Sequence, residues 1–244
     1  MMLGLDPLHL IMMVPALLLS LAATWLTRST FKKYATVPAS SGLTGAQAAE
    51  RMMRSQGVFD VKVERVDGFL SDHYDPTHKV LRLSPDVYDS NSLSAIGVAC
   101  HEAGHAMQHA RAFAPLALRT ALVPLAQFGS GAANWIILAG FLLMGIGSAG
   151  GAGLGLMILK IGIVCFSVTV VFSLVTLPVE WDASRRAKEH MVSSSIVSPG
   201  QEVAAGRVLN AAFLTYVAAA VSAVLTLLYY LLRSGLLGGR SSDD

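Results

Sequence analysis

Four long apolar stretches constrain this chain more than any other feature. A helix needs about 20 apolar residues to cross roughly 30 Å of hydrocarbon. The chain is 53% hydrophobic and only 14% charged, whereas soluble domains carry about 25% charged residues. We therefore expect a mainly α-helical, multi-pass membrane protein with four transmembrane spans. The predicted spans are Leu8–Leu26, Ala121–Met144, Leu154–Leu177 and Ala211–Leu232.

Positive charge predicts how these spans are oriented. Arg28, Lys32 and Lys33 follow the first span, and the segment Pro178–Lys188 after the third span is also strongly basic. Because the cytoplasmic ends of spans are rich in Lys and Arg, both segments are expected in the cytoplasm. They outweigh the smaller basic group around Arg233. The predicted parts are a first span (1–27), a cytoplasmic catalytic segment (28–120), a transmembrane hairpin (121–177), cytoplasmic helices (178–210), and a fourth span with its tail (211–244).

Residues 101–105 form a metal-binding motif, His-Glu-Ala-Gly-His. Ser92 or Ser94 is a suitable N-cap for a helix through this motif. On a helix, His101 and His105 project from one face and can reach a single ion. Two imidazoles suit Zn²⁺, which keeps a position open for water in catalytic sites. Glu102 can take a proton from that water, so the motif predicts a zinc hydrolase with Glu102 as the catalytic base.

A third metal ligand has to come from elsewhere in the chain. The metzincin pattern is excluded, because Gln108 and Arg111 occupy its Gly and His positions. A thermolysin-like spacing is excluded as well, because no acidic residue occurs between Glu102 and Glu180. Glu180 is the first acid available on the predicted cytoplasmic side, and it is our first choice. Asp182 is the second choice, because it points away from the helix face that Glu180 shares with Ser184.

The segment before the motif predicts a small α+β part. Thr44 is a candidate N-cap for a helix over Gly45–Ser55. The stretches Val58–Arg65 and Lys79–Leu83 alternate apolar and polar residues, as strands do. Together with the motif helix, these two strands predict a zincin-like catalytic part whose edge strand could pair with an extended peptide.

His73 and Tyr74 lie between the two predicted strands and allow two interpretations. Their side chains can donate hydrogen bonds to the tetrahedral intermediate of peptide hydrolysis, which would make both catalytic. Alternatively, they belong to a turn closed by Asp75 and Pro76. His109 lies about 12 Å along the helix from His101, too far to share its ion. We expect His109 to be a polar residue at the helix end.

Five separate motifs resemble one family. They are Ser71–Pro76, Leu81–Tyr88, Ala95–His105, Pro178–Ala187 and Val208–Val217. On these motifs the chain is similar, over nearly its whole length, to the YugP-type neutral zinc metallopeptidases, which are bacterial membrane proteins. More distantly, it resembles HtpX-type and CAAX prenyl proteases, whose third ligand lies in an E-x-x-x-D pattern. Here Ser184 occupies the place of that Asp, and Asp182 is a candidate for its role.

The resemblance implies a gluzincin-like zinc endopeptidase in the bacterial inner membrane, with its active site facing the cytoplasm. Its expected partners are a membrane-associated peptide or protein substrate and the lipid bilayer. The net charge of +2 gives no reason to expect nucleic acid. A homo-oligomer or a larger membrane complex stays open.

Two other functions fit the same composition. A site-2-type intramembrane protease would place the motif inside a span, with an intramembrane Asp, but no Asp occurs in the four predicted spans. A membrane scaffold or adaptor with a zinc site is the other alternative. Glu102 argues against it, because a structural zinc site needs no general base.

Overall fold

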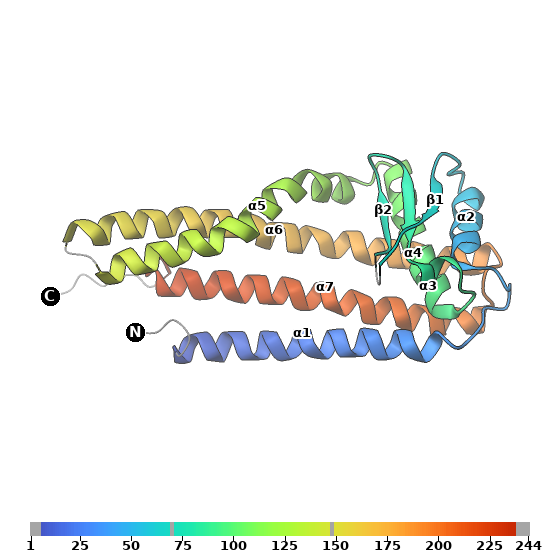
Figure 1. Ribbon diagram of the computed structural model, residues 1–244, viewed down its shortest axis with the longest axis horizontal. Coiled ribbons are helices and arrows are strands. Elements are labelled where there is room, and N and C mark those ends of the chain that lie inside the picture. Colours follow the sequence, from blue (N-terminus) through green and yellow to red (C-terminus); the bar gives the residue numbers. More distant parts are fainter. Residues whose placement is uncertain (1–5, 69–70, 147–148, 238–244) are drawn as a thin grey trace. The chain divides into compact units, whose positions relative to one another are not determined.

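The computed structural model describes residues 6–68, 71–146 and 149–237 of the 244-residue chain. Within these ranges the protein is mainly helical, with one small sheet (Figure 1). In chain order the elements are α1 (Pro7–Tyr34), α2 (Gly45–Ser55), β1 (Lys62–Arg65), β2 (His73–Asp75), β3 (Val80–Leu83), α3 (Pro85–Tyr88), α4 (Leu93–Ala110), α5 (Ala114–Ile146), α6 (Ala149–Ser193) and α7 (Pro199–Arg233).

Three of these helices are long and apolar enough to cross a membrane. They are α1, α7 and most of α6, from Ala152 to Ser193. Within α5, the parts Ala114–Gln127 and Gly131–Gly145 meet the same test together but are bent by 46°. The described residues therefore hold three candidate spans, or the predicted four if this bent pair is one span. The motif helix α4 is not among these candidates.

The chain divides into two compact units, each built from separate stretches. The first unit holds the residues up to Leu21, then Leu118–Thr176, and those from Val217 onward. The second unit holds Ala22–Ala117 and Leu177–Tyr216, and it contains both the H-E-x-x-H motif and Glu180.

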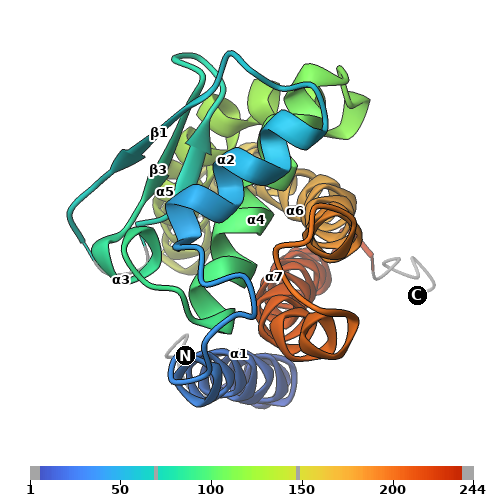
Figure 2. The same cartoon turned by 90° about the vertical axis from the view of Figure 1, so that its right-hand side faces the viewer.

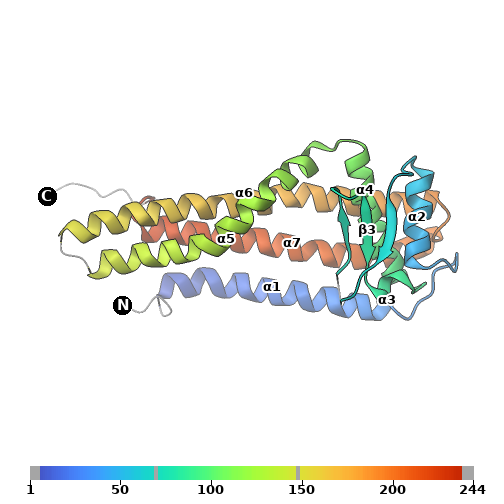
Figure 3. The same ribbon diagram turned by 45° about the horizontal axis from the view of Figure 1, so that its top comes forward.

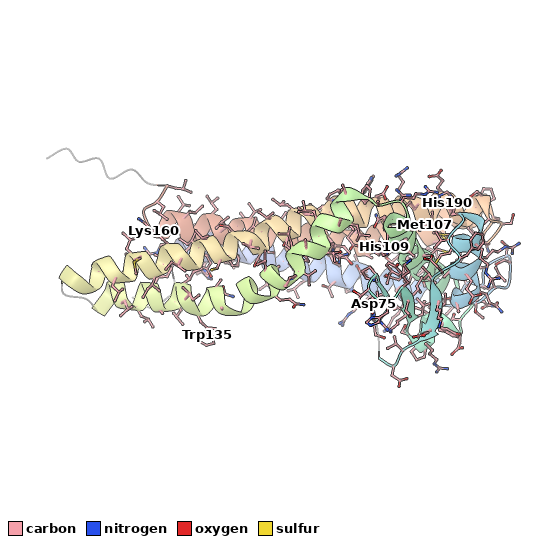
Figure 4. The ribbon with its side chains drawn as sticks, turned by 90° about the horizontal axis from the view of Figure 1, so that it is seen from above. Asp75, Met107, His109, Trp135, Lys160 and His190 are labelled. Carbon is pink, nitrogen blue, oxygen red and sulfur yellow. The ribbon has the colours of Figure 1, made fainter. Side chains whose placement is uncertain are left out.

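Apolar packing between α5 and α6 forms the core of the first unit. Ile137, Leu159 and Phe166 are among its buried side chains. The exposed side chain of Trp135 projects from α5 (Figure 4). An outward-facing aromatic of this kind is expected on a helix surface that contacts lipid.

Local signals in the sequence place the first elements of the second unit. Thr44 caps α2, and its side chain and that of Gln47 form the reciprocal bonds of a capping box. Ser92 caps α4 by accepting a hydrogen bond from the backbone N–H of Ala95. Both caps were predicted. Helix α4 lies between the sheet on one side and, on the other, the parts of α6 and α7 that belong to the same unit (Figure 2).

The sheet has three strands, whereas the sequence predicted two. The extra strand, β2, holds His73 and Tyr74, and the strand order is β1-β3-β2 (Figure 3). β3 pairs in parallel with β1 and antiparallel with β2. The first predicted strand was too long, because the N–H of Val58 bonds to Met53 in the turn after α2. Only Lys62–Arg65 of that stretch joins the sheet.

Candidate metal centre

Two helices bring three potential metal ligands together. His101 and His105 lie one turn apart on α4, and Glu180 lies on α6, two residues beyond Pro178. Oε2 of Glu180 is 3.1 Å from Nε2 of His101 and 3.6 Å from Nε2 of His105. One ligand atom from each residue lies within 4.8 Å of the other two. The structure therefore brings our first-choice ligands together.

Helix α6 continues without interruption from the third predicted span through Pro178 to Ser193. A long helix, rather than a loop, therefore fixes the position of Glu180. Its relative exposure is only 1%. Side chains held by regular helices are placed more accurately than side chains on loops.

Gly104, inside the motif, allows α4 and α6 to approach closely. A Cβ atom added at Gly104 would lie 2.7 Å from the carbonyl oxygen of Ala183. Real Cβ atoms do not approach a backbone oxygen this closely, so any other residue here would force the helices apart. The second variable position of H-E-x-x-H is thus fixed by packing against the helix that carries Glu180.

Gln108 orients His105, a role that the sequence analysis missed. The buried Gln108 amide donates from Nε2 to the carbonyl of Val179 at 2.8 Å and to Oδ2 of Asp182 at 3.0 Å. Its Oε1 is therefore left to accept a hydrogen bond from Nδ1 of His105, at 2.9 Å. Gln108 thus holds Nδ1 of His105 and leaves Nε2, which lies 3.6 Å from Oε2 of Glu180, as the nitrogen that can ligate a metal.

Asp182, our second-choice ligand, belongs to the layer behind the candidate ligands. Oδ1 accepts from Arg185 at 2.7 Å and Oδ2 accepts from Arg186 at 2.5 Å. Burial favours the neutral acid, but the hydrogen bonds from Arg186 and Arg185 outweigh it and lower the pKa of Asp182. Asp182 therefore reaches His105 only through Gln108.

Ser184 is the corresponding neighbour of His101. Its Oγ lies 3.1 Å from Nδ1 of His101. Ser184 lies four residues after Glu180, and its hydroxyl can accept a hydrogen bond from Nδ1 of His101. The two histidines are thus oriented by different neutral groups, Ser184 and Gln108.

The local electrostatics keep Glu180 ionised. Burial alone would raise the pKa of its carboxyl, but hydrogen bonds from His101 and His105 outweigh burial and hold the pKa well below its usual range. For His105, burial disfavours the charged form, while the hydrogen bond and the charge of Glu180 raise its pKa. The centre therefore supplies one carboxylate and two imidazoles, a donor set that fits Zn²⁺.

A cavity of about 170 Å³ opens beside these ligands. Glu102, His101 and Glu180 line it together with apolar side chains of α7. Asp72 also lines it, which the sequence did not predict. Burial raises the pKa of Asp72, against hydrogen bonds donated by the backbone and hydroxyl of Ser84. Glu102 thus faces a space in which a water or a substrate group fits.

His73 and Tyr74 lie on β2, outside the lining of this cavity. Nδ1 of His73 lies 2.7 Å from the carbonyl oxygen of Ser71. The Tyr74 hydroxyl lies 2.8 Å from Nδ1 of His109, which projects near the end of α4 (Figure 4). Burial, the largest cause, raises the pKa of Tyr74 to about 12. His109 is exposed and lies in the last turn of α4, the helix end that the sequence predicted.

Two comparisons with known proteins found matches over nearly the whole chain. A family model described as "Putative neutral zinc metallopeptidase" matches residues 9–235. A protein of Bacillus subtilis (strain 168), "Putative membrane protease YugP", is 45% identical over 236 residues, which cover 97% of this chain and all of the Bacillus protein. No solved structure matches the chain.

Proposed function

The chain belongs to the neutral zinc metallopeptidase family whose family model matches it, and on that premise we propose that it is a membrane-embedded, zinc-dependent endopeptidase. One observation carries the proposal. Two imidazoles and a buried carboxylate lie within one ion's reach, and Glu102 lines the cavity beside them.

In this proposal His101, His105 and Glu180 hold the zinc ion, and Asp182 supports His105 through Gln108. When bound there, zinc would polarise the scissile carbonyl and lower the pKa of water. Glu102 takes the proton from the attacking water and then donates it to the leaving amine. Gln108 and Ser184 keep the two imidazoles in the tautomers and orientations that this chemistry needs.

We place the active site on the cytoplasmic face of a bacterial inner membrane. Arg28, Lys32 and Lys33 lie in the same compact unit as the candidate metal centre, and so do Arg185 and Arg186. Clusters of Lys and Arg next to spans favour the cytoplasmic side. The substrates in this proposal are membrane proteins or proteins held close to the membrane surface.

The roles of His73 and Tyr74 stay predictions. If the Tyr74 hydroxyl stabilises the tetrahedral intermediate, Tyr74→Phe lowers kcat about 10²–10³-fold and leaves the zinc content unchanged. His73→Ala, measured in the same way, tests the imidazole. An unchanged kcat in either variant would assign that residue to the sheet and its contacts instead.

Glu102→Gln tests the proposal most directly. The variant keeps the size of the side chain, so we expect a stoichiometric zinc content. Peptide cleavage should fall about 10²–10⁴-fold, because the general base is lost. Proteomic comparison of membrane fractions should show substrates accumulating in Glu102→Gln cells. Glu50→Gln, at an exposed acid of α2, is the matched control.

Three results would contradict the endopeptidase. They are wild-type protein purified without zinc, Glu102→Gln protein that still cleaves, and full rescue of a deletion strain by Glu102→Gln. The last result would favour the scaffold. Depth measurements that place the zinc inside the hydrocarbon layer would favour the site-2-type alternative.

A further inference from the structure

A second cavity, of about 550 Å³, lies in the same unit as the candidate metal centre. It is formed by α1, α7 and the C-terminal part of α6. The metal ligands do not line it, and neither does Glu102. We call this second cavity the lipid-facing groove.

The groove is apolar at one end and basic at the other. On α1, Leu26 and Lys33 lie seven residues apart on one helix face, and on α7 Arg207 and Leu214 do the same. The hydroxyl of Thr27 donates to the carbonyl of Ala211 at 2.9 Å and joins the two helices. The two helices run in opposite directions here, because the apolar stretch of α1 ends at the level where that of α7 begins. Both leucines therefore lie at one end of the groove, and both cations lie at the other.

The cations at the basic end have no acidic partner among the described residues. Nη1 of Arg207 donates to the Tyr34 hydroxyl at 3.2 Å, and Lys33 lies over the Tyr34 ring at 5.4 Å. At the rim, Lys188 donates to Asn210 at 3.3 Å and lies 5.7 Å from the Trp181 ring centroid. Each cation therefore keeps N–H groups that can donate hydrogen bonds to a phosphate.

The groove also holds two aromatic residues. Trp181 lines it with a relative exposure of 55%, and Tyr34 lies beside the two cations. Trp and Tyr are enriched where headgroups meet acyl chains. One lipid molecule could therefore place its phosphate at the basic end of the groove and its acyl chain at the leucine end.

We propose that this groove binds one anionic phospholipid. Lys33 and Arg207 hold its phosphate, and Leu26 and Leu214 contact the first part of an acyl chain. A transmembrane segment of a substrate would fill the apolar end but would leave both cations without a counter-charge. The proposal does not depend on zinc or on peptide cleavage.

Fluorescence of Trp181 can test the proposal in the full-length protein. A Trp25→Phe/Trp135→Phe background leaves Trp181 as the single tryptophan of the chain. This protein is reconstituted in phosphatidylcholine bilayers that contain brominated phosphatidylglycerol or, in parallel, brominated phosphatidylcholine. We expect stronger quenching by the brominated anionic lipid at equal bromine content.

The charge variants then assign this preference to the groove. Lys33→Ala/Arg207→Ala should lower the relative affinity for phosphatidylglycerol about fivefold per residue, since each cation near an anionic surface contributes roughly that much. Lys32→Ala/Arg54→Ala is the matched control, because it removes the same charge from exposed positions outside the groove. We expect that control to keep the preference.

Four outcomes would overturn the proposal. Equal quenching by both lipids would show no selection for charge. An equal loss in the Lys32→Ala/Arg54→Ala control would indicate general attraction to the surface. Relief of quenching by inorganic phosphate would indicate a site for free phosphate. Displacement of the lipid by a neutral polyleucine transmembrane peptide would assign the groove to a protein segment.

Discussion

Gln108 donates a hydrogen bond from Nε2 to Oδ2 of Asp182 across 3.0 Å, and so joins α4 to α6 beside the candidate metal ligands. The same amide accepts from His105 at 2.9 Å. A single buried side chain thus fixes both the tautomer of one candidate ligand and the position of the helix that carries another.

Replacing Gln108 should therefore weaken metal binding without removing a ligand. We expect Gln108→Leu to lower zinc affinity about 10–100-fold, the usual effect of losing a group that orients a ligand. Competition with a chelating dye measures this affinity. Gln56→Leu, near the surface at the end of α2, should keep the wild-type value. Equal affinities for Gln108→Leu and wild type would show that His105 needs no such support.

Variants of two glycines in α4 allow the effect of close helix packing to be measured apart from the effect of helix propensity. Gly104→Ala puts a Cβ atom 2.7 Å from the Ala183 carbonyl oxygen, whereas Gly97→Ala puts one 3.5 Å from that of Ala205. We expect Gly104→Ala to destabilise the protein by about 1–3 kcal/mol, as overpacking does, and to lower its zinc content. Gly97→Ala should keep the zinc content and should raise the stability by up to about 1 kcal/mol, because Ala has the higher helix propensity. Thermal unfolding and metal analysis of the two variants test this, and similar values for both would contradict it.

Isosteric amides distinguish the two acids of α6. Glu180→Gln removes the carboxylate that lies against both histidines, so purified protein should lose its stoichiometric zinc. Asp182→Asn should retain zinc, with an affinity lowered about 10–100-fold, because Asp182 acts through Gln108. Metal analysis after dialysis measures the content of each variant. Retention by Glu180→Gln together with loss from Asp182→Asn would reverse the assignment.

Acid should loosen the β2–β3 pair through Asp75. Arg82 donates to Asp75 at 2.8 Å, and this bond, followed by that of His78, holds the pKa of the Asp75 carboxyl well below its usual range. A depressed folded-state pKa means that the charged form stabilises the fold. This contribution is full above the unfolded pKa of about 3.9 and is lost as pH falls through the folded pKa.

Asp75→Asn removes this acid-sensitive contribution. At neutral pH, the amides of β2 and β3 should exchange hydrogen faster in Asp75→Asn than in wild type. The difference should begin to shrink below about pH 4, where the carboxyl of the opened strand pair takes up a proton, and should vanish as pH falls through the folded pKa of Asp75. Asp67→Asn, in the turn before β2, should follow wild type throughout. A constant difference at every pH would contradict this role of Asp75.

Local signals in the sequence were sufficient for several elements of the fold. Thr44 and Ser92 cap helices where their side-chain chemistry predicted. The three candidate ligands could also be predicted from the sequence, because the motif supplies two histidines and Glu180 is the next acid in the chain. These inferences use spacing along the chain and no tertiary contact.

What sequence reasoning missed depends on packing between distant segments. β2 spans only three residues, too few for an alternating pattern to appear, and its pairing depends on β3. Gln108 looks like an ordinary polar residue until the rotation of α6 places Asp182 against it. Asp72 enters the cavity lining because Ser84 holds its carboxylate.

The continuity of α6 also sets the order of events during synthesis. His101 precedes Glu180 by 79 residues, and both predicted hairpin spans lie between them. At about 5–20 residues per second, the motif helix leaves the ribosome several seconds before its carboxylate partner. The nascent chain therefore holds an incomplete ligand set until the hairpin has been made. If the proposed function is correct, the chain can cleave peptides only after the hairpin has been synthesised.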